Sequence, residues 1–380
     1  MNIIENKLEK RLVYILLFVF TIHSLLFKSI SNNLMTIIIY LGLICGIIFI
    51  KVFLEGSIKK NDIRSFIVSV VAILPILIYG YNESKLFFLN TETIRYSLFF
   101  LICVLWNDVK ISDIKVFHII IIIFGFLCCM YQISNGITRP SGFLNSPTIF
   151  SCMIALSITY LLFEKNVNIF NYIFILIGIF EIYISESSSS LLIVFALILY
   201  KIFINFIISK KEKKADKMSD VKKKKILIFI GIASVIAGIY FVNNINALLS
   251  IIQRNNRDAS TSTRIEFIMI FINQFIHSVK MFFIGNGGGY TQAFIIKNLV
   301  SSHHMPLHQD ILMLLIEYGL LGFLYIYNFF IKKLKLNYIL LIILILFSFH
   351  NIILCPYVMC SLIISNNSLN IQYKNNKIFA

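Results

Sequence analysis

The sequence is poor in charged side chains, which make up 14% of its 380 residues. Soluble globular domains carry about 25% charged residues. The hydrophobic share is 58% and the mean hydropathy is +0.86, and this composition excludes an ordinary soluble domain. The sequence also lacks the period-2 alternation of a transmembrane barrel. Its repeated apolar runs have the length, about 17–25 residues, that helices need to cross a hydrocarbon core.

The first apolar run lacks the small-residue cleavage site of a secretory signal peptide. It begins at Leu12, behind basic residues at positions 7, 10 and 11, and we predict that it is retained as the first membrane span. The seven cysteines all lie inside apolar runs, a placement that predicts neither a disulfide framework nor a zinc site.

We therefore predict an all-α, polytopic integral membrane protein with about 11–12 transmembrane helices. The predicted spans are 12–28, 34–54, 65–81, 93–106, 115–134, 147–163, 169–185, 190–208, 226–243, 308–331 and 338–354, and the short segment 355–365 completes a twelfth if the C-terminus is cytoplasmic. Residues 1–243 then hold spans one to nine, residues 244–307 form one long extracytoplasmic loop, residues 308–365 hold the remaining spans, and residues 366–380 form a cytoplasmic tail.

The net charge of +16 would suggest a nucleic-acid partner in a soluble protein. Here most lysines and arginines fall in alternate loops, as the positive-inside rule requires of cytoplasmic segments. The densest run, KKEKKADKMSDVKKKK, lies in the predicted cytoplasmic loop 209–225 and fits a topological anchor better than a patch for anionic lipid. We expect a multi-pass protein of the cytoplasmic (inner) membrane that binds no nucleic acid.

The loop 244–307 is longer than a connector needs and contains a helix signal of its own. Thr263-Arg264-Ile265-Glu266 fits a capping box, the apolar stretch 265–276 follows, and the glycine cluster 285–289 ends the helix. The apolar stretch is too short to cross a membrane, so we predict a helix that lies at the outer interface.

His308 is the first candidate for chemistry in this loop region. Pro306 is placed to start the tenth span, which puts His308 in its first turn, where the helix dipole favours a neutral ring. A neutral imidazole can act as a general base toward a hydroxyl, and a histidine that merely sits at the interface is the alternative. A metal site at His303, His304 and His308 is disfavoured, because Pro306 separates His304 from the helix and no acidic partner beyond Asp310 is evident.

Arginines on the predicted outer side are candidate anion ligands, because the rigid fork of a guanidinium matches phosphate oxygens. They are Arg139, Arg254, Arg257 and Arg264. For any one of them an anchor on lipid head groups is the alternative. Their joint presence on the side where positive charge is sparse favours a functional role.

Glu317 lies near the middle of the tenth span, where a carboxyl group must be protonated, paired or facing water. Arg95 is the expected counter-charge, and both an ion pair and a substrate contact stay open. The glycine cluster 285–289 is a weak phosphate-loop signal because no strand precedes it, and turn glycines are the favoured interpretation. Gly319 and Gly322 are interpreted as positions of close helix packing.

Four segments carry a family resemblance in combination. RPSGFLNSPTIFS at 139–151 has an arginine, a glycine and an asparagine with a proline before a span, and ISESSSSLL at 184–192 is a serine-rich turn without the arginine often found there. Arg264 opens a helix that ends in Gly-x-Gly, and PLHQDILMLLIEYGLLG at 306–322 has a proline-histidine start and a glutamate-glycine finish, with Gln309 in place of the commoner asparagine. Together they resemble the family of O-antigen ligases and O-antigen polymerases.

The resemblance implies transfer of a glycan linked to undecaprenyl diphosphate at the outer face of the membrane, without metal or other cofactor. Of the family's two activities we favour a polymerase that joins repeat units into O-antigen or capsular polysaccharide. His308 would be the base, and Arg264 and Arg139 would hold the diphosphate. Further candidate substrate ligands are Arg254, Arg257, His304, Asn145 and Glu317. Membrane lipids, a chain-length regulator and a flippase are candidate partners.

Two alternatives stay open. An O-antigen ligase would move the finished polymer to lipid A core, and the motifs do not separate it from a polymerase. A flippase or another transporter would show corresponding broken helices in two halves of the chain, whereas the polar loop here lies only in the C-terminal half.

Overall fold

The structure is a computed structural model. It describes residues 7–22, 32–55, 63–64, 67, 98, 101–103, 105–107, 109, 111, 113–144, 146–165, 167–212, 269, 273, 277–287, 290–291, 310–334 and 355–373. Within these ranges the regular structure is helical and contains no strand, which confirms the all-α prediction for this part of the chain.

The chain divides into two compact units. One contains residues 1–199 and 273–380, and the other contains residues 200–272. In the second unit the structure describes the end of one helix, residues 200–212, and Met269. The contacts discussed below all lie within the first unit.

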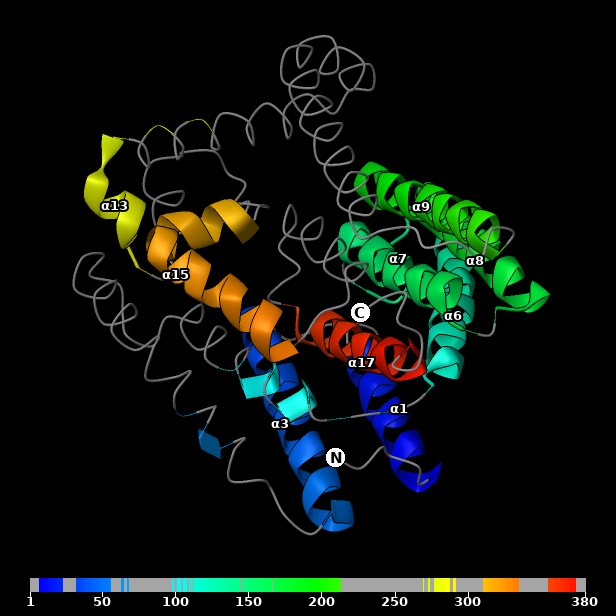
Figure 1. Cartoon of the computed structure of the whole chain (residues 1–380), viewed down its shortest axis with the longest axis horizontal. Helices are drawn as coiled ribbons and strands as arrows, with labels where there is room; N and C mark the ends of the chain where they lie inside the picture. The colour runs from blue at the N-terminus through cyan, green and yellow to red at the C-terminus, as the bar shows by residue number, and fades with distance from the viewer. Residues whose placement is uncertain are drawn as a thin grey trace. The chain divides into compact units, whose positions relative to one another are not determined.

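Nine helices are described, and Figure 1 shows them along the chain. They are α1 (Lys7–Thr21), α3 (Asn32–Glu55), α6 (Lys115–Ser134), α7 (Pro147–Phe163), α8 (Ile169–Ile184), α9 (Ser188–Glu212), α13 (Val279–Phe283), α15 (Asp310–Leu334) and α17 (Pro356–Tyr373).

The bounds of α6 and α7 coincide with the spans predicted at 115–134 and 147–163. Pro147 is the first residue of α7, where its missing N–H costs no helical hydrogen bond. The helices α1, α3, α8, α9 and α15 overlap their predicted spans with shifted ends. The spans predicted at 226–243 and 338–354 lie outside the described residues, and those at 65–81 and 93–106 are described only in part.

Apolar side chains are exposed in stripes along three helices. The stripes are Val116, Ile120, Ile123 and Leu127 on α6, Ile169, Ile173, Leu176, Phe180 and Tyr183 on α8, and Leu192, Phe195, Leu199 and Ile202 on α9. Their spacing of three or four residues places each set on one face of its helix. Exposed apolar stripes of this extent indicate contact with a membrane or a partner rather than with water.

One described helix, α6, is long and apolar enough to cross a membrane by length and composition. Its 20 residues extend about 30 Å. Shorter apolar helices lie within α3, α7, α8, α9 and α15. These helices agree with an all-α membrane protein.

Helices pack closely where glycine faces a neighbour. A Cβ on Gly42 of α3 would meet the ring of Phe20, and a Cβ on Gly46 would meet the side chain of Leu16. Two small residues four positions apart are typical of helix pairs in membranes. Farther along the chain, α6, α7 and α8 each contact the other two.

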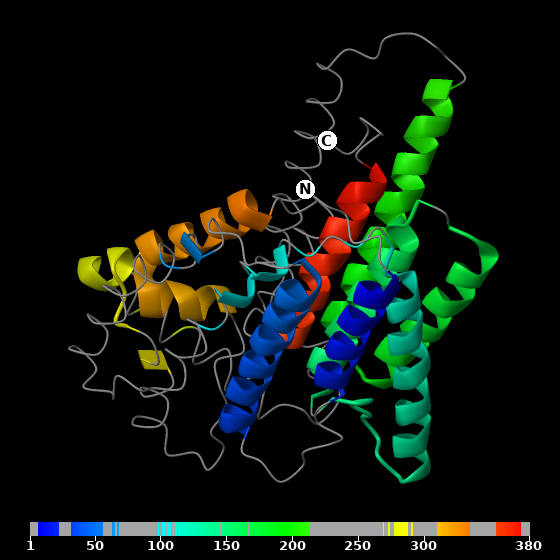
Figure 2. The same cartoon turned by 90° about the horizontal axis from the view of Figure 1, so that it is seen from below.

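The last helix, α17, packs against α1, α3 and α7 (Figure 2) and is buried from Pro356 to Leu369. Its buried polar residues are Ser361, Ser365, Asn366, Asn367 and Ser368. The side chain of Asn367 donates to the carbonyl oxygens of Asn107 and Val109, each at 3.0 Å. The helix therefore continues beyond residue 365, where the sequence predicted the tail to begin, because its polar side chains find hydrogen bonds inside the protein.

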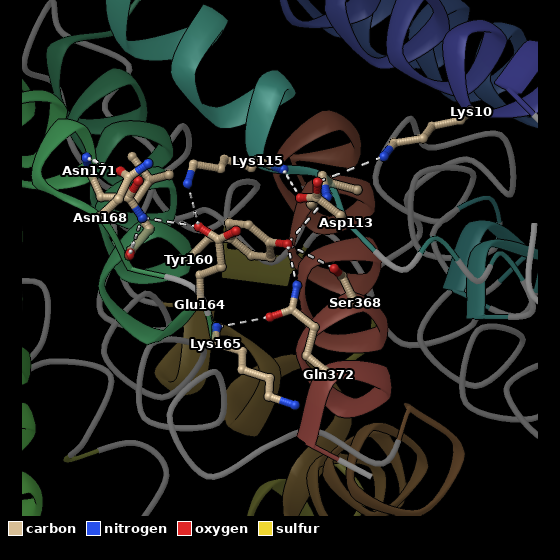
Figure 3. A network of polar contacts seen from close by, with 12 residues as sticks. Lys10, Asp113, Lys115, Tyr160, Glu164, Lys165, Asn168, Asn171, Ser368 and Gln372 are labelled. Atoms are coloured by element: carbon tan, nitrogen blue, oxygen red, sulfur yellow. Dashed lines mark hydrogen bonds and ion pairs between the residues drawn. The ribbon is translucent and has the colours of Figure 1, made fainter. Parts of the chain in front are cut away.

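The hydroxyl group of Tyr160 is the centre of a polar network between α7 and α17 (Figure 3). It accepts from the Ile114 N–H at 3.2 Å and from the Gln372 side chain at 3.0 Å, and it lies 2.8 Å from Ser368 Oγ. The Gln372 side chain also accepts from the main-chain N–H of Lys165 at 3.1 Å. One tyrosine thus joins the start of α6, the end of α7 and the end of α17.

His118 reinforces this junction. Its ring is fully buried, with Nδ1 3.0 Å from Ser157 Oγ and Nε2 3.0 Å from Ser365 Oγ. The ring also stacks on that of Tyr160, with 4.6 Å between centroids. The histidine therefore links α6, α7 and α17, because each ring nitrogen contacts a serine of a neighbouring helix.

Charged groups also lie at the end of the helix bundle that contains Tyr160. Lys10 Nζ of α1 lies 3.9 Å from the Asp113 carboxylate, and Lys115 Nζ lies 3.2 Å from the Glu164 carboxylate (Figure 3). The N-terminal helix, the segment before α6, the turn after α7 and the end of α17 therefore meet. These are four of the segments that the sequence predicts on the cytoplasmic side.

Replacing Tyr160 with Phe should destabilise the protein, because the Ile114 N–H and the Ser368 hydroxyl would lose a buried partner. We expect a loss of about 1–3 kcal/mol, measured as a lower thermal midpoint of the purified full chain in detergent. Tyr172→Phe is the matched control, since Tyr172 is 54% exposed on α8. Equal midpoints for the two variants would contradict a bridging role for Tyr160.

Candidate functional site

The segment between α6 and α7 is held by the side chain of Gln132. Its Nε2 donates to Gly142 O at 2.8 Å, and its Oε1 accepts from the N–H groups of Ser141 and Gly142 at 2.8 and 3.1 Å. Gly142 has a φ of +58°, and a Cβ there would meet the ring of Phe150. The amide thus satisfies main-chain groups of the turn and fixes the loop that carries Arg139.

Arg139 joins this loop to the end of α8. Its Nε donates to Ser185 O at 3.0 Å, and Ser185 is the C-cap residue of α8. The arginine itself is exposed. The contact brings together two segments that carry the family resemblance, 139–151 and 184–192.

The serine-rich turn after α8 faces the protein interior. Ser185, Ser187 and Ser190 are buried. Ser187 Oγ donates to Ser190 Oγ at 3.1 Å, and Cys152 Sγ of α7 lies 3.6 Å from Ser190 Oγ. These serines therefore pack the start of α9 against α7.

Glu181 lies one turn before Ser185 on α8 and is fully buried. Neither carboxyl oxygen has a hydrogen-bond partner among the described residues. A Cβ on Gly125 of α6 would stand 2.5 Å from Glu181 Oε2. The glycine on α6 therefore makes room for this carboxyl group.

A second group of contacts surrounds the glycine cluster after α13. The side chain of Ser278 accepts from the Met281 N–H and so starts α13 as a separate helix. The helix predicted over 265–276 is described only at isolated helical positions. After α13 the chain turns with φ of +82° at Gly285 and +94° at Gly287, values that favour glycine. These values agree with turn glycines.

The helix α15 is broken at Gly319, which has φ of +63° and ψ of −177°. The break removes the helical donors for the carbonyl groups of Ile316 and Glu317. The Asn286 N–H donates to Ile316 O at 3.0 Å, and the Gly287 N–H donates to Glu317 O at 2.7 Å. The turn therefore satisfies main-chain carbonyls that the break would otherwise expose.

We call this contact the glycine clasp and define it as residues 285–287 and 316–319. A Cβ on Gly285 would meet the main chain of Glu317 and Gly319, and a Cβ on Gly319 would meet the main chain at the end of α13. The two backbones touch directly, and α13 lies against α15 (Figure 2). Close packing at Gly319 was expected from the sequence, but the break in the helix was not.

Glu317 ties the clasp to the chain that follows it. Its Oε1 accepts from Thr291 Oγ1 at 2.5 Å and from the Thr291 N–H at 3.4 Å. The exposed fractions of Glu317 and Thr291 are 1% and 2%. The counter-charge expected from the sequence, Arg95, lies outside the described residues.

Six predicted site residues lie outside the described residues, and their roles stay predictions. They are Asn145, Arg254, Arg257, Arg264, His304 and His308. The contacts of Gln132 and Thr291 were missed by the sequence analysis. A single polar residue near a helix end or after a glycine cluster belongs to no repeat or motif that would have marked it.

A comparison with protein families bears on these segments. Residues 173–327 match the family model described as O-antigen ligase. This segment belongs to the O-antigen ligase family. The match confirms the resemblance found in the sequence, and members of the family are membrane-associated enzymes that transfer glycans carried on lipids. No curated protein matches the chain.

The O-antigen ligase segment contains the serine-rich turn, the glycine clasp and most of α15. It also contains Arg264 and His308. The loop with Arg139 precedes it in the sequence and reaches it through the bond to Ser185. This bond links the segment to α6 and α7.

Replacing Gly285 with Ala should disrupt the clasp, because the added Cβ has no space between the two backbones. Gly136→Ala is the matched control, since Gly136 has nearly the same φ, +80°, but nothing within 4 Å of its Cβ position. Both variants carry the conformational cost of about 1–2 kcal/mol. We expect Gly285→Ala to lose at least about 2 kcal/mol more in thermal unfolding of the full chain. Equal losses would contradict direct contact of the two backbones in the clasp.

Proposed function

We propose that the protein is a polysaccharide polymerase of the cytoplasmic membrane. It joins undecaprenyl-diphosphate-linked repeat units into O-antigen or capsular polysaccharide, with an active site on the extracytoplasmic side. The observation that carries this proposal is the O-antigen ligase match over 173–327, which contains both Arg264 and His308. The candidate partners are the lipid-linked glycan, a flippase that delivers it and a chain-length regulator.

In the proposed reaction a sugar hydroxyl of the acceptor attacks the anomeric carbon of the donor glycan. The new glycosidic bond forms as the bond from that carbon to the diphosphate breaks. The hydroxyl proton passes to His308, which acts as a general base. Undecaprenyl diphosphate leaves with the bonding electrons, and no oxidant or cofactor is required by this balance.

Arginine side chains would stabilise the negative charge that grows on the diphosphate. Arg264 is assigned to this role, with Arg139, Arg254 and Arg257 as further ligands. The exposed position of Arg139 and its bond to Ser185 O support a guanidinium held in one orientation at the edge of the bundle. Asn145 and His304 are proposed as additional substrate contacts.

The principal alternative is an O-antigen ligase, which uses the same kind of donor but transfers a finished polymer to lipid A core. We favour the polymerase because the sequence agrees with the family only in a few short motifs. Polymerases differ widely from one another outside such motifs. A composition heavy in Ile, Asn and Lys suggests an AT-rich genome and would also suit a capsule polymerase.

His308→Ala should abolish polymer formation while the protein is still expressed and inserted. In the native host the glycan should change from a ladder of lengths to single repeat units, as seen on a glycan gel. His277→Ala is the matched control, because this exposed histidine bonds only to Asn273 O one turn away among the described groups. An unchanged ladder in His308→Ala would refute the assigned base, and long polymer left on the lipid carrier would identify a ligase instead.

Arg264→Ala should lower transfer at least about a hundredfold, the scale of removing one preorganised charge donor. Arg264→Lys should recover only part of the activity, because an ammonium keeps the charge and loses the fork of donors. Transfer is measured in membranes with lipid-linked glycan. Arg64→Ala is the control, since this exposed residue lies in a predicted cytoplasmic loop. Complete recovery with lysine would mean that Arg264 supplies charge alone.

A further inference from the structure

One end of a part of the predicted outer loop is bonded to the helix that follows its other end. Thr291 is the last described residue before it and Asp310 is the first described residue after it. The Thr291 side chain bonds to Glu317, which lies two turns into α15 from Asp310. In the sequence His308 stands between these ends, two residues before Asp310.

We propose that Glu317 is a positioning residue for glycosyl transfer, which acts through Thr291 and the glycine clasp rather than by contact with the glycan. This inference rests on the proposed function and changes one assignment within it. The sequence suggested Glu317 as a substrate ligand.

Burial supports the positioning role. The exposed fraction of Glu317 is 1%, and Oε1 is already committed to two donors of Thr291. The main-chain oxygen of the same residue accepts from Gly287 at 2.7 Å. One residue therefore holds the chain on both sides of positions 288–289, once through its backbone and once through its side chain.

The break in α15 makes the position of its first part depend on the contacts of Glu317. The part of the helix before Gly319 runs from Asp310 to Tyr318 and is separated from the longer second part by the change in φ and ψ. Its last carbonyl groups receive donors from the clasp, so its position follows that of the glycine turn. In the sequence His308 stands two residues before the first residue of this short helix, so we expect under this proposal that loosening the clasp displaces the base. A shift of about 1 Å in a reacting group can lower a rate about a hundredfold.

The experiment is a double-mutant cycle on the full chain, with Thr291→Val, Glu317→Ala and the combined variant. The donor is lipid-linked repeat unit extracted from cells that lack this protein. We expect each single change to lower kcat at least about tenfold while KM stays within about twofold, and the combined variant to be no worse than the worse single one. Glu317→Gln should stay within about threefold of the native kcat, because its amide oxygen can accept both Thr291 hydrogen bonds.

Thr159→Val is the control for loss of a buried threonine hydroxyl. Thr159 Oγ1 donates to Ala155 O within α7, away from the clasp, and its loss should leave kcat unchanged. Two results would overturn the proposal. One is a rise in KM of about tenfold in Glu317→Ala without a similar rise in Thr291→Val, as expected of a substrate contact. The other is additive losses of kcat in the combined variant.

A second measurement needs no glycan. The thermal midpoints of both single variants should fall, that of Glu317→Ala further because it loses both Thr291 bonds, and the combined variant should fall no further than Glu317→Ala. If the native protein transfers no glycan, the proposed polymerase is wrong, and the thermal cycle alone decides whether Glu317 acts through Thr291. Additive thermal losses would overturn the inference even in an active enzyme.

Discussion

A main-chain carbonyl buried in a protein needs a hydrogen-bond donor, and the glycine clasp is built on this constraint. The break at Gly319 takes helical donors away from Ile316 and Glu317, and the turn after α13 supplies two N–H groups in their place. The broken helix and the glycine turn are therefore stable only together. Glycine is required on both sides because the two backbones approach without room for a Cβ.

The same constraint explains why α17 is buried. From hydropathy alone, the most apolar segments are expected in the protein interior. Instead the serines and asparagines of α17 are buried, and α8 exposes isoleucine, leucine and phenylalanine. The polar side chains of α17 bond to the segment before α6, to Tyr160 and to His118. In a protein surrounded by lipid, apolar side chains can face outward, and polar side chains are stable in the interior where they find hydrogen-bond partners.

The sequence predicted the elements whose ends carry local signals. The helix bounds expected at 115–134 and 147–163 were correct to the residue, because a charged segment precedes one and Pro147 begins the other. It did not predict the extension of α17 to Tyr373, since hydropathy counts each asparagine as a cost and contains no information about its partner. For the same reason a single glycine in an apolar run was interpreted as a packing position, and the break at Gly319 needed the structure. Long-range contacts such as Thr291 with Glu317 have no local signal at all.

Arg139 illustrates how one residue can serve both the fold and the proposed chemistry. The carbonyl of Ser185 lies at the C-terminal end of α8, where helical donors run out and the dipole favours a cation. The Nε of Arg139 supplies the missing donor at 3.0 Å and fixes the plane of the guanidinium. A lysine could also neutralise the helix end, but its ammonium group lacks the further donors that a planar guanidinium holds in a fixed geometry. An arginine bound in this way is oriented before any anion arrives, so the anchor at the helix end would lower the entropy cost of holding a diphosphate.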